Sequence, residues 1–255
     1  MELSELTGRL DERLDIAAYA DLDASPNGLQ VGPESGTVEH VAVAVDAAVE
    51  TVERAADAGA DLLVTHHGLI WGDMERVTGS NYRRIAPLVD HDLPLYVSHL
   101  PLDGHQELGN AAGVADVLNL GNREPFGSLG PEVIGQRGTA SEPYAVDELR
   151  NLLADELDTG DGAVRALDFG PDEIRDVAIV TGSGVDWLDE AADAGVDALV
   201  TGEGKQKAFH EAREAGINVV LAGHYATETF GVQSLQSLIG EWGLETTFID
   251  CPTGL

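Results

Sequence analysis

Apolar residues recur along the chain in two alternating patterns, short runs of strand length and longer segments with helical spacing. The runs at 38–46 and 61–65 have the length and composition of buried strands. Between them, residues 47–58 have helical spacing, and Gly59, a residue type that commonly ends helices, follows. A helix over residues 4–19, with leucines on one face, precedes this unit. The order strand, helix, strand predicts a βαβ unit with parallel strands.

The chain contains an internal duplication. Residues 41–68 align with residues 177–204 over 28 positions without a gap, and 13 of these positions are identical. A further helix and strand follow each copy, and the first copy has 11 additional residues, which match a loop at 69–80 that carries Trp71. The repeat predicts an α/β fold of two duplicated lobes with mostly parallel sheets and flanking helices.

The repeat also sets the expected domain boundaries. We expect an N-terminal lobe over residues 1–122 and a C-terminal lobe over residues 171–255. A connecting segment over residues 123–170 contains one predicted helix at 146–157. A long amphipathic helix and a last strand at 244–250 end the sequence, and the two lobes are expected to share one metal site.

Two adjacent histidines follow the second predicted strand. His66 and His67 come directly after the run 61–65 and before Gly68. Ligands of open α/β sheets bind at the carboxyl ends of strands. Because neighbouring side chains on a strand point to opposite faces, both rings reach one site only if the strand has already ended, and Gly68 permits a turn there. The pair predicts a metal site, and the alternative is two loop histidines with local hydrogen bonds.

The ends of other predicted strands carry further metal-ligand side chains. In both copies a strand ends in a histidine, and a carboxylate follows four residues later. These residues are His99 and Asp103 in the first copy and His224 and Glu228 in the second. A further candidate is Glu203, which stands in the second copy where the first has His67. Facing lobes would bring them into a nitrogen- and oxygen-rich site that suits two metal ions sharing a carboxylate. Imidazole and carboxylate donors without thiolate fit Zn, Mn, Fe, Co or Ni.

Several of these residues have a second interpretation. If a helix begins at His224, that residue and Glu228 lie on one face, where they can share a metal or form an ion pair. Asp103 and His99 can be ligands or can orient ligands. Asp103 can also be the N-cap of a helix predicted over residues 106–117.

The turn at 181–184 also has two interpretations. Its sequence, Thr-Gly-Ser-Gly, follows a predicted strand and precedes a predicted helix. This pattern is typical of a phosphate-binding loop at a helix start. A simple turn between a strand and a helix is the alternative, because the first copy has Asp-Ala-Ala at the corresponding place.

The composition is strongly acidic. The formal net charge is −32, from 46 acidic and 14 basic residues that are spread along the whole chain. This charge disfavours binding to nucleic acid and to anionic membranes. It fits a cytoplasm with high salt, since the Debye length falls to about 3 Å at 1 M. Cys251 is the only cysteine and no apolar run approaches membrane-spanning length, so we expect a cytoplasmic protein without a membrane partner.

Taken together, these motifs resemble those of the NIF3-like (DUF34) family of dinuclear-metal proteins. The resemblance covers nearly the whole chain and rests on PNGLQVG at 26–32, LVTHHGLIW at 63–71, HLPLD at 99–103, TGEGKQKAFHEARE at 201–214 and AGHYATETFGVQ at 222–233. The family more often has HTNLD at 99–103, a departure that leaves the ligand positions filled. The resemblance implies two facing α/β lobes and a toroidal homohexamer with metal pairs that face the inner cavity.

The resemblance also implies which residues hold the metals. One metal would take His67, Asp103 and Glu228, and the other would take His66, His224 and Glu228, so that Glu228 bridges two divalent ions per chain. His99 and Glu203 would line the pocket. Many members of the family carry the name GTP cyclohydrolase 1 type 2 homolog.

The expected activity is metal-dependent hydrolysis of a small-molecule, nucleotide-like substrate. Water acidified by two divalent ions would attack an electrophilic carbon, such as C8 of a purine with release of formate, or a phosphorus. Glu203 or His99 could then move protons. The alternative is a non-catalytic ring protein that binds metal for a binding or regulatory role.

Overall fold

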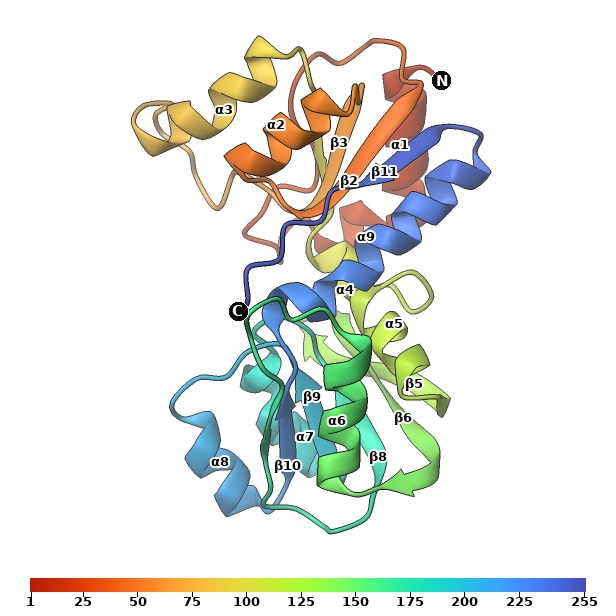
Figure 1. Cartoon of the computed structure of the whole chain (residues 1–255), viewed down its shortest axis with the longest axis vertical. Coiled ribbons are helices and arrows are strands. Elements are labelled where there is room, and N and C mark those ends of the chain that lie inside the picture. The colour runs from red at the N-terminus through yellow and green to blue at the C-terminus, as the bar shows by residue number, and fades with distance from the viewer. The chain divides into compact units, whose positions relative to one another are not determined.

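The computed structural model describes residues 1–255, and the chain divides into two compact units, each with one β-sheet and flanking helices (Figure 1). Unit 1 comprises Met1–Leu102 and Gly231–Cys251, and unit 2 comprises Asp103–Phe230 and Pro252–Leu255. This division differs from the lobes expected from the repeat for two reasons. The last strand of the chain pairs within the sheet of unit 1, and residues 123–170 contribute strands to the sheet of unit 2.

The sheet of unit 1 has five strands. In sequence order they are β1 (Gly28–Val31), β2 (His40–Asp46), β3 (Leu62–His67), β4 (Leu95–Val97) and β11 (Glu245–Phe248). In space the order is β1-β4-β3-β2-β11, with β1 antiparallel to β4 and all other pairs parallel. The parallel strands β2, β3 and β4 are nearly continuous apolar runs, as expected for strands that are buried on both faces. Their carboxyl ends therefore meet at one edge of the sheet.

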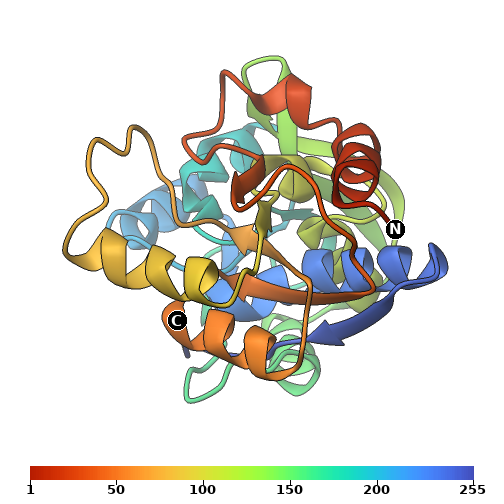
Figure 2. The same ribbon diagram turned by 90° about the horizontal axis from the view of Figure 1, so that it is seen from above.

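Helices cover both faces of this sheet. They are α1 (Leu3–Leu14), the 3-10 helix η1 (Ile16–Tyr19), α2 (Val49–Asp57), α3 (Ser80–Asp90) and the later turns of α9 (His224–Glu241). In Figures 1 and 2, α2 and α3 lie on one face, and α1 and α9 lie on the other. Val52 of α2 and Leu88 of α3 pack against the buried strand residues. The first helix is shorter than predicted because Asp15 adopts a left-handed conformation with φ 49°.

The sheet of unit 2 has six strands. They are β5 (Leu120–Leu129), β6 (Glu132–Tyr144), β7 (Arg165–Leu167), β8 (Ile174–Ile179), β9 (Ala198–Thr201) and β10 (Asn218–Leu221). In space the order is β5-β6-β8-β9-β10-β7. Only β8, β9 and β10 pair in parallel, and the other three pairings are antiparallel. The antiparallel strands β5, β6 and β7 lie outside the sequence repeat, so the repeat alone could not predict them.

The helices of unit 2 also lie on both sides of its sheet. They are α4 (Leu100–Gly104), which spans the unit boundary, α5 (Asn110–Val117), α6 (Val146–Glu156), η2 (Gly184–Trp187), α7 (Leu188–Asp193), α8 (Ala208–Ala215) and the first turns of α9. Leu149 and Leu153 of α6 and Val114 of α5 belong to one buried cluster with the strands. No helix of the chain combines the length and the apolar character needed to cross a bilayer.

The duplication is visible in the topology. Strands β2, β3 and β4 of unit 1 correspond to β8, β9 and β10 of unit 2, and each set is parallel. In both units the third repeated strand pairs antiparallel with a strand from outside the repeat, β1 or β7. The predicted α/β fold of two related sheets with flanking helices is confirmed.

Candidate metal centre

Three histidines of unit 1 lie together at the carboxyl edge of its sheet. His66 and His67 are the last residues of β3, and His99 follows β4. A ring nitrogen of each lies within 4.8 Å of those of the other two. The prediction that the strand ends before the pair is wrong, because β3 continues through His67. The two ring centroids are nevertheless 4.6 Å apart. The paired strands end at this edge, so side chains at the last two positions can turn over it.

Each of the three imidazoles is oriented by a hydrogen bond at Nδ1. The acceptors are the carbonyl oxygen of Ser98 for His66 at 3.0 Å, the carboxylate of Asp46 for His67 at 2.8 Å, and the carboxylate of Asp23 for His99 at 2.8 Å. A carbonyl or carboxylate oxygen only accepts, so each Nδ1 carries the proton of its hydrogen bond, and Nε2 is the atom through which each ring could ligate a metal. This arrangement is the one found for histidines that ligate metals.

The loop before β1 holds His99 in place. Asp23 accepts hydrogen bonds from the His99 ring, from the backbone N–H of Leu100 and from Asn27 Nδ2. Asn27 in turn accepts a 2.7 Å bond from the His99 backbone N–H. Burial alone would raise the pKa of Asp23, but the hydrogen bond and positive potential of His99 outweigh it and leave the pKa lowered. The motif at 26–32 therefore supports the histidine cluster through Asn27 and also supplies strand β1.

Gln30 connects this loop to the segment after β3. Its Oε1 accepts hydrogen bonds from the backbone N–H groups of Leu69 and Ile70, at 3.1 and 3.3 Å. Its Nε2 donates to the Pro26 carbonyl at 2.7 Å. Gly68 is required beside it, because a Cβ at this position would overlap the Gln30 amide. One side chain therefore fixes the backbone directly after the histidine pair.

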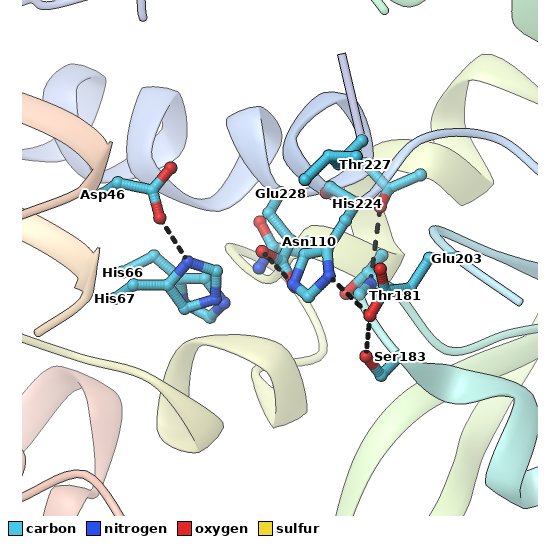
Figure 3. A network of polar contacts seen from close by, with 12 residues as sticks. Asp46, His66, His67, Asn110, Thr181, Ser183, Glu203, His224, Thr227 and Glu228 are labelled. Carbon is cyan, nitrogen blue, oxygen red and sulfur yellow. Dashed lines mark hydrogen bonds and ion pairs between the residues drawn. The ribbon is translucent and has the colours of Figure 1, made fainter. Parts of the chain in front are cut away.

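Unit 2 carries a second set of donors at the carboxyl edge of its own sheet (Figure 3). His224 is the first residue of α9, as the i and i+4 spacing required, and its Nε2 lies 3.2 Å from Glu228 Oε2. Its Nδ1 lies 3.4 Å from Glu203 Oε1. Ser183, in the turn after β8, donates a 2.5 Å bond to the same Glu203 oxygen. His224 therefore lies between two carboxylates.

The charges of these carboxylates change the titration of His224. Burial lowers the pKa of His224, but the hydrogen bond and charge of Glu228, followed by those of Glu203, outweigh burial and raise the pKa to about 9. The pKa of Glu203 is lowered, first by the hydrogen bond from Ser183 and then, against desolvation, by His224. The donor set of unit 2 thus favours a positive charge.

Asp103 completes the unit 2 set. It lies in α4, is 7% exposed, and has a carboxylate oxygen within 4.8 Å of one from Glu228. Asn110 Nδ2 donates to Asp103 Oδ1 at 2.8 Å, and Thr181 Oγ1 donates to the same oxygen at 3.2 Å. The alternative that Asp103 caps the following helix is wrong, because Gly109 is the N-cap of α5.

The turn after β8 packs closely against these donors. Gly182 has φ +57°, and a Cβ there would overlap Glu228 Oε1 and lie 3.0 Å from His224 Nε2. The neighbouring residues Thr181 and Ser183 donate to Asp103 and Glu203. The turn at 181–184 thus supplies hydrogen bonds to the donor set and allows the helix α9 to approach.

Within each unit, the structure brings the sequence-predicted residues together. The partners that orient them were missed, and they are Asp23, Asp46, Asn110, Thr181 and Ser183. A signal existed for Asp46, which ends β2 at the register position of His67 in the neighbouring strand. No comparable signal marks Asp23 or Asn110, because their positions depend on how distant segments pack.

The donor chemistry of both sets fits divalent metal ions. Unit 1 offers imidazole lone pairs on oriented rings, and unit 2 offers one imidazole and buried carboxylates. Neighbouring buried carboxylates are costly unless positive charge compensates them. The raised pKa of His224 is consistent with this demand for positive charge. The chain therefore carries clusters of side chains that could hold metal.

Comparison with known sequences gives a consistent result. The family model Duf34/NIF3 (NGG1p interacting factor 3) matches residues 1–253. A Halobacterium salinarum protein named GTP cyclohydrolase 1 type 2 homolog is 57% identical over 255 residues, which is 100% of both chains. A protein of the same name from Escherichia coli K12 is 37% identical over 99% of both chains.

Solved structures agree. A protein from Thermus thermophilus is 36% identical, covers 100% of both chains and has a TM-score of 0.89. The protein ybgI, described as being of unknown function, is 34% identical, also covers 100% of both chains and has a TM-score of 0.90. The chain belongs to the DUF34/NIF3 family.

Proposed function

We propose that this chain binds two divalent metal ions and uses them to hydrolyse a small, nucleotide-like substrate. The ligands in this proposal are His66, His67, Asp103, His224 and Glu228, with Glu228 bridging. His99 and Glu203 are assigned to the substrate pocket. The names of the relatives, GTP cyclohydrolase 1 type 2 homolog, favour a guanine nucleotide among such substrates.

One observation carries the metal assignment. The three imidazoles of unit 1 have their Nδ1 protons directed at oxygen acceptors, with ring nitrogens within 4.8 Å of one another. Histidine ligands of metals are commonly oriented by such a bond at the other ring nitrogen, and the proposal makes His66 and His67 ligands and places His99 beside them in the pocket.

We assign both donor sets to one dinuclear centre. His99 and Asp103 are only four positions apart in the chain, so the segment that ends the unit 1 set begins the unit 2 set. The unit 1 set supplies imidazole nitrogens, and the unit 2 set supplies the carboxylates that balance divalent charge. Fewer protein ligands than a closed site requires leave positions for water and substrate, as in catalytic centres.

When bound, divalent ions supply Lewis acidity that lowers the pKa of water and polarises an electrophile. The protein side chains have separate tasks. Glu203 stays a carboxylate because its pKa is lowered, so its Oε1 can accept a proton. The Nδ1–H of His99 is held by Asp23, so its Nε2 can orient the substrate. Attack at C8 of guanine, with two water molecules consumed in all, would open the ring and release formate.

Metal content and product release test this function together. Protein purified without added metal is analysed for metal per chain, and protein reloaded with Zn²⁺, Mn²⁺, Co²⁺ or Fe²⁺ is incubated with GTP. We expect about two ions per chain, and release of formate or phosphate that a chelator stops. Glu228→Ala should lose metal and product release together.

Two outcomes would contradict the proposal. Two ions per chain in Glu228→Ala would overturn the ligand assignment. Full metal loading without formate or phosphate release from GTP or other nucleotides would favour the alternative role as a metal-dependent binding or regulatory protein. Phe209→Ala is a suitable control, because Phe209 is exposed, packs edge-to-face on Phe169 and is not among the donors.

A further inference from the structure

An exposed tryptophan lies beside the histidine cluster of unit 1. Trp71 is in the loop between β3 and α3, and its residue surface is 48% exposed. Its ring centroid lies 4.9 Å from that of His99, in an edge-to-face arrangement with an interplanar angle of 77°. The centroid distance to His67 is 6.0 Å. The indole ring beside the cluster is therefore partly open to solvent.

Hydrogen bonds of its own loop hold the Trp71 ring in a defined position. Indole Nε1 donates a 3.1 Å hydrogen bond to the Gly68 carbonyl, so the polar edge of Trp71 is satisfied by its own turn. The preceding residues Leu69 and Ile70 are held by Gln30. The ring is thus held beside His67 and His99 with part of its surface open, which is the arrangement that a planar ligand can stack on.

The other two tryptophans have contacts that explain them locally. Trp187 donates from Nε1 to the Ser128 carbonyl at 3.0 Å, next to the β5–β6 turn. The guanidinium of Arg9 lies over the ring of Trp242 at 5.7 Å. Trp187 ends η2 in the segment between β8 and α7, and Trp242 lies directly after α9. Trp71 differs from both in facing the candidate metal ligands.

We propose that Trp71 is a stacking platform that recognises the planar base of the ligand and presents it to the histidine cluster. This inference rests on the proposed function, which places the reaction of the ligand at the metal centre. The group that Trp71 would recognise is a planar heteroaromatic ring, such as a purine. Stacking on an aromatic side chain accepts any base with a π face. Loss of one such contact weakens binding by about 5- to 150-fold.

Intrinsic fluorescence makes the ring its own reporter. In a Trp187→Phe/Trp242→Phe background, Trp71 is the only tryptophan of the chain. We expect guanosine and GTP to quench its emission, after correction for absorbance, whereas ribose 5-phosphate and inorganic triphosphate leave it unchanged. Quenching by the non-planar probes to the same extent as by guanosine would overturn the stacking assignment.

Calorimetric titration of the metal-loaded protein with GTP gives the energetic test. Trp71→Ala should weaken binding by about 5-fold or more, and Trp71→Phe, which keeps a smaller ring, should weaken it less. Phe209→Ala, which removes another exposed aromatic ring, should bind as the wild type does. Equal affinity of Trp71→Ala and wild type would overturn the inference.

Metal content separates this inference from the proposed function. Trp71 donates no ligand atom, so Trp71→Ala should hold as much metal as the wild type. If the wild type holds no metal but guanosine still quenches Trp71, the hydrolase proposal fails and the platform stands. If metal is bound and GTP is turned over equally well by Trp71→Ala, with an unchanged KM, the platform fails and the hydrolase proposal stands.

Discussion

At the scale of single residues, the site depends on oxygen acceptors that keep each imidazole in one tautomer. His67 is the clearest case, because its Nδ1 partner Asp46 comes from the neighbouring strand at the same register position. A carboxylate partner also raises the basicity of the ring and so strengthens metal binding through the other nitrogen. Asp46 is therefore a positioning residue for His67.

Replacing Asp46 should weaken metal binding without unfolding unit 1. Its side chain is 34% exposed, so Asp46→Ala leaves no large buried cavity. We expect the affinity for Zn²⁺ to fall about 10- to 100-fold, measured by competition with a chelating dye. The matched control is Glu50→Ala, which removes the same charge from the exposed first turn of α2, where Glu50 pairs with Arg54. Equal losses in both variants would show a general charge effect and contradict the positioning role.

The histidines could be predicted from the sequence, and their partners could not. A pair of histidines after an apolar run, and a carboxylate four residues after another histidine, are local patterns. Asp23 reaches His99 across 76 positions, and Thr181 reaches Asp103 across 78. Such contacts are created by packing of distant segments, so no spacing rule for a single sequence predicts them.

At the scale of structural elements, the start of α9 determines the geometry of the unit 2 donors. His224 and Glu228 share a helix face, and the turn after β8 lies against both. Gly182 permits this approach in two ways, since its φ is +57° and it has no Cβ. The two contributions can be separated, because other glycines of the chain have positive φ but open surroundings.

Gly182→Ala should disturb the metal site more than it disturbs the fold. Its Cβ would meet the flexible end of Glu228, which can move away at little cost to stability but leaves its ligand position. Gly59→Ala is the control, with φ +76° and nothing within 4 Å of the added Cβ. We expect both variants to lose about 1 kcal/mol of unfolding free energy in urea, from the left-handed backbone alone. Only Gly182→Ala should lose metal, by about 10-fold or more in affinity.

An unchanged metal affinity in Gly182→Ala would mean that Glu228 keeps its place without help from this turn. A much larger loss of stability than in Gly59→Ala would mean that the neighbouring backbone cannot adjust. In either case the turn would have a structural role alone.

The elements themselves follow the sequence pattern closely where both faces are covered. The apolar runs became β2 and β3, and the helical spacing between them became α2. The pattern of apolar and polar residues failed where a strand contains polar residues or glycine. β3 continues through two histidines, and β1 begins at Gly28 with φ +96°, although an Asn-Gly pair is typical of a turn. Pairing with β4 supplies the hydrogen bonds that make this Gly-containing segment a strand.

At the scale of the whole molecule, the repeat accounts for the repeated parallel strands of both sheets but not for the additional strands that extend each sheet. The sheet of unit 1 gains β11 from the end of the chain, next to β2. The sheet of unit 2 gains the β5–β6 hairpin next to β8. These edge strands differ between the units although the repeated strands correspond. A repeat predicts which strands pair with each other, and it carries no information about which outside segment covers the remaining edge.

The acidic surface is also a property of the whole molecule, and it predicts a specific dependence on salt. The chain has 46 acidic residues and only 14 basic ones, so most carboxylates have no Lys or Arg to pair with one to one. Repulsion among them opposes the compact state until salt screens it. The Debye length falls from about 10 Å at 0.1 M to about 3 Å at 1 M, so most of the screening is complete by 1 M.

We therefore expect the melting temperature of the protein to rise steeply with KCl, by about 10 °C up to 1 M, and then to level off. Sucrose at equal osmolality, which favours burial without screening, should give a smaller and unsaturated rise. A melting temperature that is independent of KCl below 1 M would show that the acidic surface is tolerated without salt, and the expectation of a high-salt environment would then be wrong despite the 57% identity to a Halobacterium salinarum protein.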